Sequence, residues 1–276
     1  MVEASLTPRG PYLLRLIVRS GIWSAALPGG DVVTAWQQPD GNVHVRARTE
    51  ESVERARFML ALDDDTAEFH RRFARDSLLG PSARALVGMR PLRLATVAHA
   101  ALRAFCGQLI QSSRARAIER SIARATGTAV PTREVLAAFA PAELRRHGLA
   151  ADRASALIRL CRTVDLEQLR EHSTPVVLER LSRERGLGPW SCGVIALEGL
   201  GRYDLGLAGD LGLVKLASSL RGRSVEAWET AELLAPYGEW QGLAGEFLLA
   251  GWARGLVPGA DSDAGRLART RARRAA

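Results

Sequence analysis

The sequence VVLERLSRERGLGPWSCGVIALEGLGRYDLGLAGDLGL spans residues 176–213 and decides the fold. Its pattern predicts a helix, a tight glycine turn, a second helix, a loop and the start of a third helix. Gly186 and Gly188 flank Leu187 in the turn, and glycine tolerates the positive φ that such a hairpin needs. Pro189 suits the first position of the second helix, because a proline there loses no helical hydrogen bond.

The same stretch brings a carboxylate close to an anion-binding turn. Backbone N–H groups at a helix start can point at a phosphate, and the helix dipole favours negative charge there. Asp210 lies twenty residues after Trp190, at the mouth of the third helix. We therefore predict a site that binds the phosphates of a nucleic-acid backbone and holds a carboxylate nearby. The residues alone leave a second interpretation open, in which Asp210 only caps its helix.

Composition favours a polyanionic partner. The chain has 276 residues and a net charge of +8, from 38 Lys+Arg against 30 Asp+Glu. Lys215 is the single lysine, so almost all of the basic charge is arginine, whose planar fork suits phosphate. A GC-rich coding sequence produces the same arginine bias, so composition carries little weight alone.

Several classes of protein are disfavoured. Cys106, Cys161 and Cys192 lie far apart without CxxC spacing, which argues against a disulfide framework, a zinc site or an iron–sulfur cluster. We expect no metal site, and a reducing cytoplasm fits these cysteines. No apolar run reaches 18 residues, so we expect no membrane span. The GLGPW glycines do not follow a strand, so we expect no nucleotide cofactor.

The order of predicted elements indicates an α+β fold. Three β-rich stretches precede a helix that starts near Glu50, and they occupy residues 11–20, 31–38 and 42–48. We expect an N-terminal α/β domain over residues 1–90, a helical domain over 91–258 and a basic, disordered tail over 259–276. Residues 63–65 are three aspartates, which we interpret as a helix cap rather than a metal site.

The motifs GLGPWSCGVIALEGLG (186–201) and AGDLGL (208–213) resemble the helix-hairpin-helix-GPD superfamily of DNA glycosylases. Within it, the chain is most similar to the bacterial 3-methyladenine DNA glycosylase II group. Residues 58–81, 88–127 and 144–161 are similar to stretches that this group carries in the same order. The resemblance covers about residues 5–255. It implies a small N-terminal layer like half of a TATA-binding-protein fold, followed by a helical glycosylase domain.

The resemblance also implies the chemistry. Asp210 matches the family's catalytic aspartate, which stabilises positive charge on the sugar or orients water while an alkylated purine leaves. Trp190 stands where strand-cutting relatives carry a lysine, and Lys215 does not match that position. The expected enzyme is therefore monofunctional, with water as the nucleophile. Trp190 is also expected to form a wall of the base pocket, against an alternative of plain core packing.

Further roles follow from the same resemblance. Gln108 and Leu109 match the segment that enters the duplex, with Leu109 as the wedge; on periodicity alone, Leu109 would be core. Gly186, Leu187 and Gly188 are expected to present N–H groups to a phosphate. Hairpins of this kind also hold a structural monovalent cation through carbonyls; no other cofactor is expected. The implied partner is damaged double-stranded DNA in the nucleoid of the cytoplasm, and we expect a monomer.

Two departures from the family concern the pocket. Val194 replaces a common tyrosine, and Gln241 replaces an arginine in a motif near the C-terminus. Trp240 and Trp252 are further candidates for the base pocket. Removal of an oxidised or deaminated purine therefore remains an alternative function. Binding of damaged DNA without cleavage is another, although a pure binding protein has no need of the Asp210 carboxylate.

Overall fold

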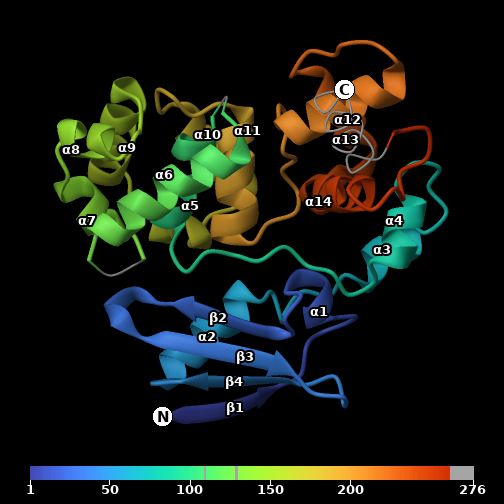
Figure 1. Ribbon diagram of the computed structural model, residues 1–276, viewed down its shortest axis with the longest axis horizontal. Coiled ribbons are helices and arrows are strands. Elements are labelled where there is room, and N and C mark those ends of the chain that lie inside the picture. The colour runs from blue at the N-terminus through green and yellow to red at the C-terminus, as the bar shows by residue number, and fades with distance from the viewer. Residues whose placement is uncertain (109, 128–129, 262–276) are drawn as a thin grey trace, which may run out of the picture.

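This computed structural model (Figure 1) describes residues 1–108, 110–127 and 130–261. Its N-terminal layer is a four-stranded antiparallel sheet in the order β1–β4–β3–β2. The strands are β1 (Val2–Leu6), β2 (Ile22–Ala26), β3 (Val32–Gln37) and β4 (Val43–Ala47). Helix α2 (Glu50–Met59) packs against β1, β3 and β4, and the sheet forms the lower part of the molecule in Figure 1.

The sheet follows from alternating side chains. Val43, Val45 and Ala47 of β4 are buried, and they form one core with Val53 and Ala56 of α2. A hairpin joins β3 to β4, and a turn at η1 (Pro28–Gly30) joins β2 to β3. The strands predicted over 31–38 and 42–48 are confirmed.

The strand predicted over residues 11–20 is wrong. The segment forms α1 (Leu14–Ile17), a single helical turn. The Leu13 N–H donates to the Gly88 carbonyl, and the Leu14 N–H donates to the Gln37 side chain, so these groups do not pair with a strand. The side chain of Leu14 is buried in the core, and this burial explains why the segment over residues 11–20 is apolar without being a strand. Strands β1 and β2 were not predicted, because small and polar residues weaken their alternating pattern.

Helices make up the rest of the fold. After α2 come α3 (Ala67–Phe73), α4 (Gly80–Ala85), α5 (Val97–Gly107), α6 (Ser112–Ala125), α7 (Arg133–Ala138), α8 (Pro141–Arg146), α9 (Ala151–Thr163) and η2 (Glu167–Glu171). They are followed by α10 (Thr174–Ser182), α11 (Pro189–Val194), η3 (Ile195–Leu200), α12 (Leu211–Arg221), α13 (Glu229–Leu234), η4 (Ala235–Trp240) and α14 (Gln241–Trp252). The break predicted near residues 111–113 is confirmed between α5 and α6.

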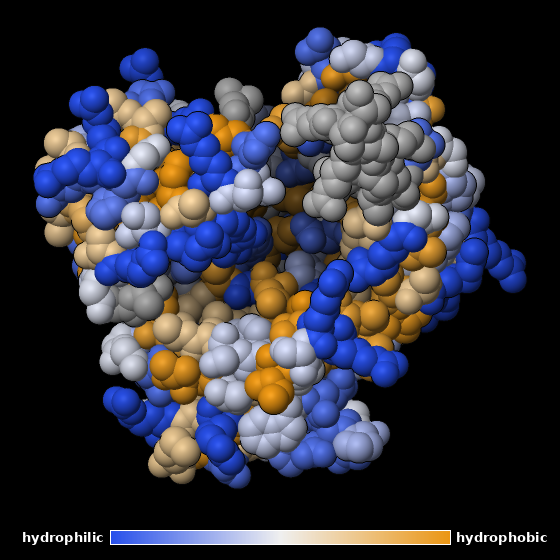
Figure 2. Space-filling model, viewed as in Figure 1, coloured by the Kyte–Doolittle hydropathy of each residue, from blue (hydrophilic) through white to orange (hydrophobic). Residues whose placement is uncertain are grey.

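The helices form two groups with a hollow between them. Helices α5 to α11 lie on one side in Figure 1, and α12 to α14 lie on the other with α3 and α4 beside them. Apolar residues of α3 and α4 belong to the helical core, although they precede the boundary expected at residue 90. Figure 2 shows the hollow between the two groups, above the sheet.

No helix among the described residues is both long and apolar enough to cross a bilayer. Cys106, Cys161 and Cys192 are buried and free. Within the described ranges, no group of His, Cys, Asp or Glu could hold a metal ion. The aspartates at 63–65 instead form an ion pair with Arg57, a buried pair with Arg93 and a hydrogen bond from the Ala67 N–H, while the N-cap residue of α3 makes no side-chain cap. The tail lies outside the described residues from 262 onward.

Candidate active site

Helices α10 and α11 form the predicted hairpin. Gly186 has a φ of 94°, a conformation that glycine adopts without strain. Gly188 has a φ of −93°, so only one of the two glycines needs positive φ. Pro189 is the first residue of α11, as predicted. The side chain of Leu187 is buried between the helices and closes the turn against the core.

One side of this turn is open. A Cβ built on Gly188 would meet no heavy atom within 4 Å. Within the described chain, the N–H groups of Gly186 and Gly188 have no hydrogen-bond acceptor. The N–H of Leu187 donates to the Glu184 carbonyl, which corrects the expectation that Leu187 also offers its N–H to a phosphate. Two open N–H groups at a helix start suit an anion.

Gln108 connects the hairpin to the end of α5. Its Nε2 donates to the carbonyl of Gly186 at 2.7 Å and to the Oγ of Ser191 at 3.0 Å. Arg153 donates to the Gln108 carbonyl at 2.7 Å and fixes the backbone there. Leu109, the predicted wedge, lies outside the described residues. Gln108, the residue before it, is thus hydrogen-bonded directly to the turn that is predicted to bind a phosphate.

The turn also suits the monovalent cation that the resemblance implies. The Gly186 carbonyl accepts one hydrogen bond from Gln108, and the Gly188 carbonyl accepts one from the Cys192 N–H at 3.0 Å. Each oxygen keeps a second lone pair for a cation. A bound cation would order the turn and add positive charge beside a phosphate.

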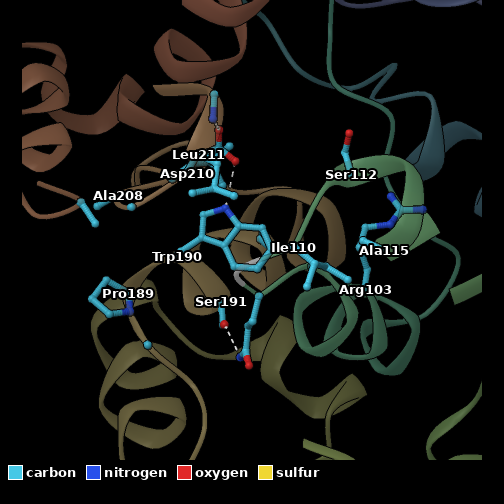
Figure 3. A pocket seen from close by; sticks show the side chains of 18 of the residues that line it. Arg103, Ile110, Ser112, Ala115, Pro189, Trp190, Ser191, Ala208, Asp210 and Leu211 are labelled. Carbon is cyan, nitrogen blue, oxygen red and sulfur yellow. Dashed lines mark hydrogen bonds between the residues drawn. The ribbon is translucent and has the colours of Figure 1, made fainter. Parts of the chain in front are cut away.

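Trp190 and Asp210 come together, although they are twenty residues apart in the sequence. The Nε1 of Trp190 donates to the Oδ2 of Asp210 at 3.1 Å, and Figure 3 shows this bond in the cavity. The indole packs on α5 where Gly107 leaves room for it: a Cβ on Gly107 would lie 2.4 Å from the Cη2 of Trp190. The position of the ring therefore depends on the absence of a side chain at Gly107.

Asp210 caps a helix and lines the cavity at the same time. Its Oδ1 caps α12 by accepting from the N–H of Gly212 at 2.7 Å and of Leu213 at 3.2 Å. The carboxylate is half-buried and also lines the cavity. The Gly209 N–H donates to the Oγ1 of Thr230 at 2.7 Å and fixes the loop before the cap. The cap thus holds the carboxylate in place beside the cavity.

The cavity has a volume of about 1240 Å³ and lies between the two helix groups (Figure 2). The predicted residues that line it are Gln108, Gly186, Leu187, Gly188, Trp190, Asp210 and Trp252. Val194 also lines it, so that departure from the family lies in the pocket itself. Trp252 is 3% exposed, and its Nε1 donates to the Asp261 carbonyl, so the cavity meets only a small part of it.

Trp240 does not line this cavity. Its ring stacks on Tyr203 with centroids 6.0 Å apart and contacts Phe69 at 5.7 Å. The assignment of Trp240 to the base pocket is therefore corrected: it is a packing residue between η4 and α3. Gln241, the other departure, also lies outside the cavity lining.

A charged network that sequence reasoning missed forms another part of the wall. Arg103 of α5 pairs with Glu119 at 2.8 Å and with Glu198 of η3. Burial alone would raise the pKa of Glu119, but hydrogen bonds from His99 and Arg103 lower it to about 2. The segment η3 is π-helical, a distortion that is common at functional sites. It places the Glu198 side chain in the cavity lining.

Glu246 of α14 was also missed. It lines the cavity with Asp210 and Glu198, and burial raises the pKa of its carboxyl to about 7. The sequence did hold a signal, because Glu246 is the single charged residue in the apolar stretch QGLAGEFLLAGW. A charge inside an otherwise apolar helix points to a polar site rather than to the core.

In comparisons with known proteins, no protein-family model and no curated protein matches the sequence. Among solved structures, a 3-methyladenine DNA glycosylase from Archaeoglobus fulgidus superposes with a TM-score of 0.77 at 21% identity, over 92% of this chain and 98% of that chain. The fold is that of the helix-hairpin-helix DNA glycosylases.

Two further solved glycosylases also superpose on this chain. The 8-oxoguanine glycosylase/lyase of Clostridium acetobutylicum, crystallised with double-stranded DNA, has a TM-score of 0.72 at 18% identity over 92% of this chain and 98% of its own. The 3-methyladenine DNA glycosylase of Schizosaccharomyces pombe, crystallised with abasic DNA, has a TM-score of 0.53 at 17% identity over 75% of this chain and 98% of its own. Glycosylases with different lesions and different chemistry thus share this fold, so the lesion has to be argued from the site.

Proposed function

We propose that this protein is a monofunctional DNA glycosylase that releases alkylated purines from duplex DNA by hydrolysis. The observation that carries the proposal is the Asp210 carboxylate, which is held against the Trp190 indole at the edge of a cavity. A volume of about 1240 Å³ leaves room for a purine that has left the duplex, together with part of its backbone.

The chemistry needs little beyond this carboxylate. A purine methylated at N3 or N7 is a cation and a good leaving group. When its bond to C1′ breaks, the electron pair goes to the base and the sugar becomes positively charged. The ionised Asp210 stabilises that charge and orients a water molecule, which adds to C1′ and gives up a proton. The face of Trp190 stacks on the electron-poor base and favours the damaged form.

Binding to DNA is assigned to the hairpin. The N–H groups of Gly186 and Gly188 have no acceptor within the described chain, and the space beside Gly188 is open to a phosphate. We assign the wedge to Leu109 from the resemblance and from its position after Gln108. A wedge at this place would fill the space of the departed base while the hairpin holds the backbone.

The absence of strand cutting is argued from position 190. Relatives that cut the strand carry a lysine there, and this chain has a tryptophan. Lys215 lines the cavity too, but it is exposed on α12, more than a helical turn beyond Asp210. Water is therefore the proposed nucleophile, and an abasic site is the proposed product.

One alternative has specific support. Val194 leaves the pocket without the tyrosine common in the alkylation-repair group, and 8-oxoguanine glycosylases share the fold. Both observations favour a wider or shifted range of purine lesions. The test is release from methylated genomic DNA, with the free bases identified by mass spectrometry. The proposal predicts 3-methyladenine and 7-methylguanine. Release of neither base would contradict it.

A further inference from the structure

Glu246 faces the reaction site from the helix opposite Asp210. It lies one helical turn before Leu249 on α14, so the two side chains share a face. Leu249 packs on the first turn of α12: a Cβ on Gly212 would lie 2.8 Å from its Cδ2. The helix start that Asp210 caps is therefore the surface that this face of α14 covers. Both Glu246 and Leu249 line the cavity.

Glu246 differs from the neighbouring carboxylates because it has no partner. Asp210 accepts three hydrogen bonds, and Glu198 is paired with Arg103. Among the described residues, no hydrogen bond or ion pair reaches the half-buried carboxyl of Glu246. Ionisation of such a group is costly unless a ligand compensates for the lost water. The group is therefore available to a molecule that enters the cavity.

Charged groups face Glu246 from several elements, and Arg90, Arg93 and Arg254 line the second cavity with it. Burial is the largest cause that raises its pKa to about 7, followed by the carboxylates of Glu198 and Asp210, while Arg116 of α6 acts in the opposite direction. Arg103 of α5 and Lys215 of α12 also line the cavity, and Arg103 is already paired with Glu119 and Glu198. Near neutral pH, the protonated and ionised forms of Glu246 are thus both populated.

We propose that Glu246 is a second catalytic acid of this site, whose protonated carboxyl serves neutral purines that cannot leave as cations. The proposal rests on the glycosylase function proposed above. It extends the substrate class from alkylated, cationic purines to uncharged purine lesions that present a basic ring nitrogen or carbonyl oxygen to α14.

The proposed step is a general-acid cleavage of the glycosidic bond. The carboxyl O–H of Glu246 gives its proton to a ring nitrogen of the purine while the bond between C1′ and N9 breaks and its electron pair passes to the base. Water adds to C1′, and its proton passes through Asp210 to solvent. The ionised Glu246 regains a proton from solvent. A second cavity of about 610 Å³, which Glu246 also lines, gives solvent a route to this side.

Protonation of Glu246 matters for a neutral base only. A neutral base needs the proton to leave, so its release follows the protonated fraction of Glu246. A cationic base leaves as a neutral molecule without taking up a proton, so its release does not depend on that fraction. In the wild-type protein, release of the neutral base alone should therefore follow the protonation of Glu246.

The experiment uses two duplexes, one with a single hypoxanthine and one with a single 7-methylguanine. Single-turnover release is measured between pH 6 and 8 for the wild type and for Glu246→Gln, which keeps the shape but cannot titrate. In the wild type, hypoxanthine release should fall by about tenfold over this range, since the protonated share of a group with a pKa near 7 changes by that factor. In Glu246→Gln, the hypoxanthine profile should be flat, while the 7-methylguanine profile should match that of the wild type. Glu68→Gln is the control, because Glu68 is exposed on α3, and it should keep the wild-type slope for hypoxanthine.

The outcomes separate the two proposals. If Glu246→Gln leaves the hypoxanthine profile as steep as in the wild type, Glu246 is not the proton donor. If the wild type releases 7-methylguanine but no hypoxanthine at pH 6, the inference also fails while the proposed function stands. If neither base is released, the proposed function itself is wrong. Thermal unfolding of each variant checks that the fold is retained.

Discussion

The indole Nε1 of Trp190 donates a hydrogen bond of 3.1 Å to the Oδ2 of Asp210, and this bond joins the hairpin to the carboxylate across the cavity. The other carboxylate oxygen caps α12. The position of Asp210 is thus set by two elements at once, which hold its carboxylate beside the cavity.

Trp190→Phe should reduce release without unfolding the protein. Phenylalanine keeps an aromatic ring at this position but loses the bond to Asp210 and the outer edge of the indole that packs on Gly107. A hydrogen bond to a charged group contributes about 1.5–3 kcal/mol, so we expect a fall of roughly tenfold to a hundredfold in the single-turnover rate. The measurement is release of 7-methylguanine from a duplex. A wild-type rate would show that the bond has no part in the reaction.

Two substitutions of Gly188 form a matched pair that tests phosphate binding at the turn. Gly188→Ala adds a Cβ into open space and should bind DNA as the wild type does. Gly188→Asp adds a negative charge where the phosphate is proposed to lie, and we expect an affinity about tenfold lower, or about 1.4 kcal/mol. Fluorescence anisotropy at several salt concentrations measures both. If the two variants bind DNA with equal affinity, the phosphate does not bind at this turn.

Borohydride trapping tests the nucleophile. A lysine that attacks C1′ forms a Schiff base, which borohydride fixes as a covalent protein–DNA complex. We expect no such complex, and we expect DNA to be cut only after treatment with alkali. Lys215→Ala should leave release of the base in place, because the proposed nucleophile is water. A trapped complex that disappears in Lys215→Ala would identify Lys215 as the nucleophile instead.

Glu119 predicts a pH-dependent contribution to stability. Its pKa is about 2 in the folded protein against an ordinary 4.5, so its contribution is present above pH 4.5 and is lost as the pH falls towards 2. Glu119→Gln should lower the free energy of unfolding by roughly 3 kcal/mol at pH 7 and by about half of that at pH 3. Urea unfolding at the two pH values measures the difference. A constant difference would mean that the ion pairs of Glu119 are not its source.

The sequence predicted the parts of the site that lie in one continuous pattern. The turn glycines, Pro189, Trp190 and the capping Asp210 are local features, and the structure brings them together as expected. The pairing of β3 with β4 was predictable for the same reason, because turn residues and alternation specify a hairpin.

Other features depend on contacts that no local pattern encodes. Helix α14 is apolar around most of its circumference, so periodicity could not tell which face meets the cavity, and Trp240 was assigned to the pocket although it packs on Tyr203. Glu246 enters the site because α14 crosses α12 at Asp210. The residues 11–20 look like a strand, but the Gln37 side chain and the Gly88 carbonyl take the hydrogen bonds that a strand would need.

The central claim is that the Asp210 carboxylate drives hydrolysis of the glycosidic bond. Asparagine caps helices as well as aspartate does, so Asp210→Asn should retain the fold and the affinity for DNA while it loses the charge. The most direct measurement is single-turnover release of 7-methylguanine from a duplex by the wild type and by Asp210→Asn. We expect the rate of release to be at least about a hundredfold lower for Asp210→Asn than for the wild type. Release at the wild-type rate would contradict it.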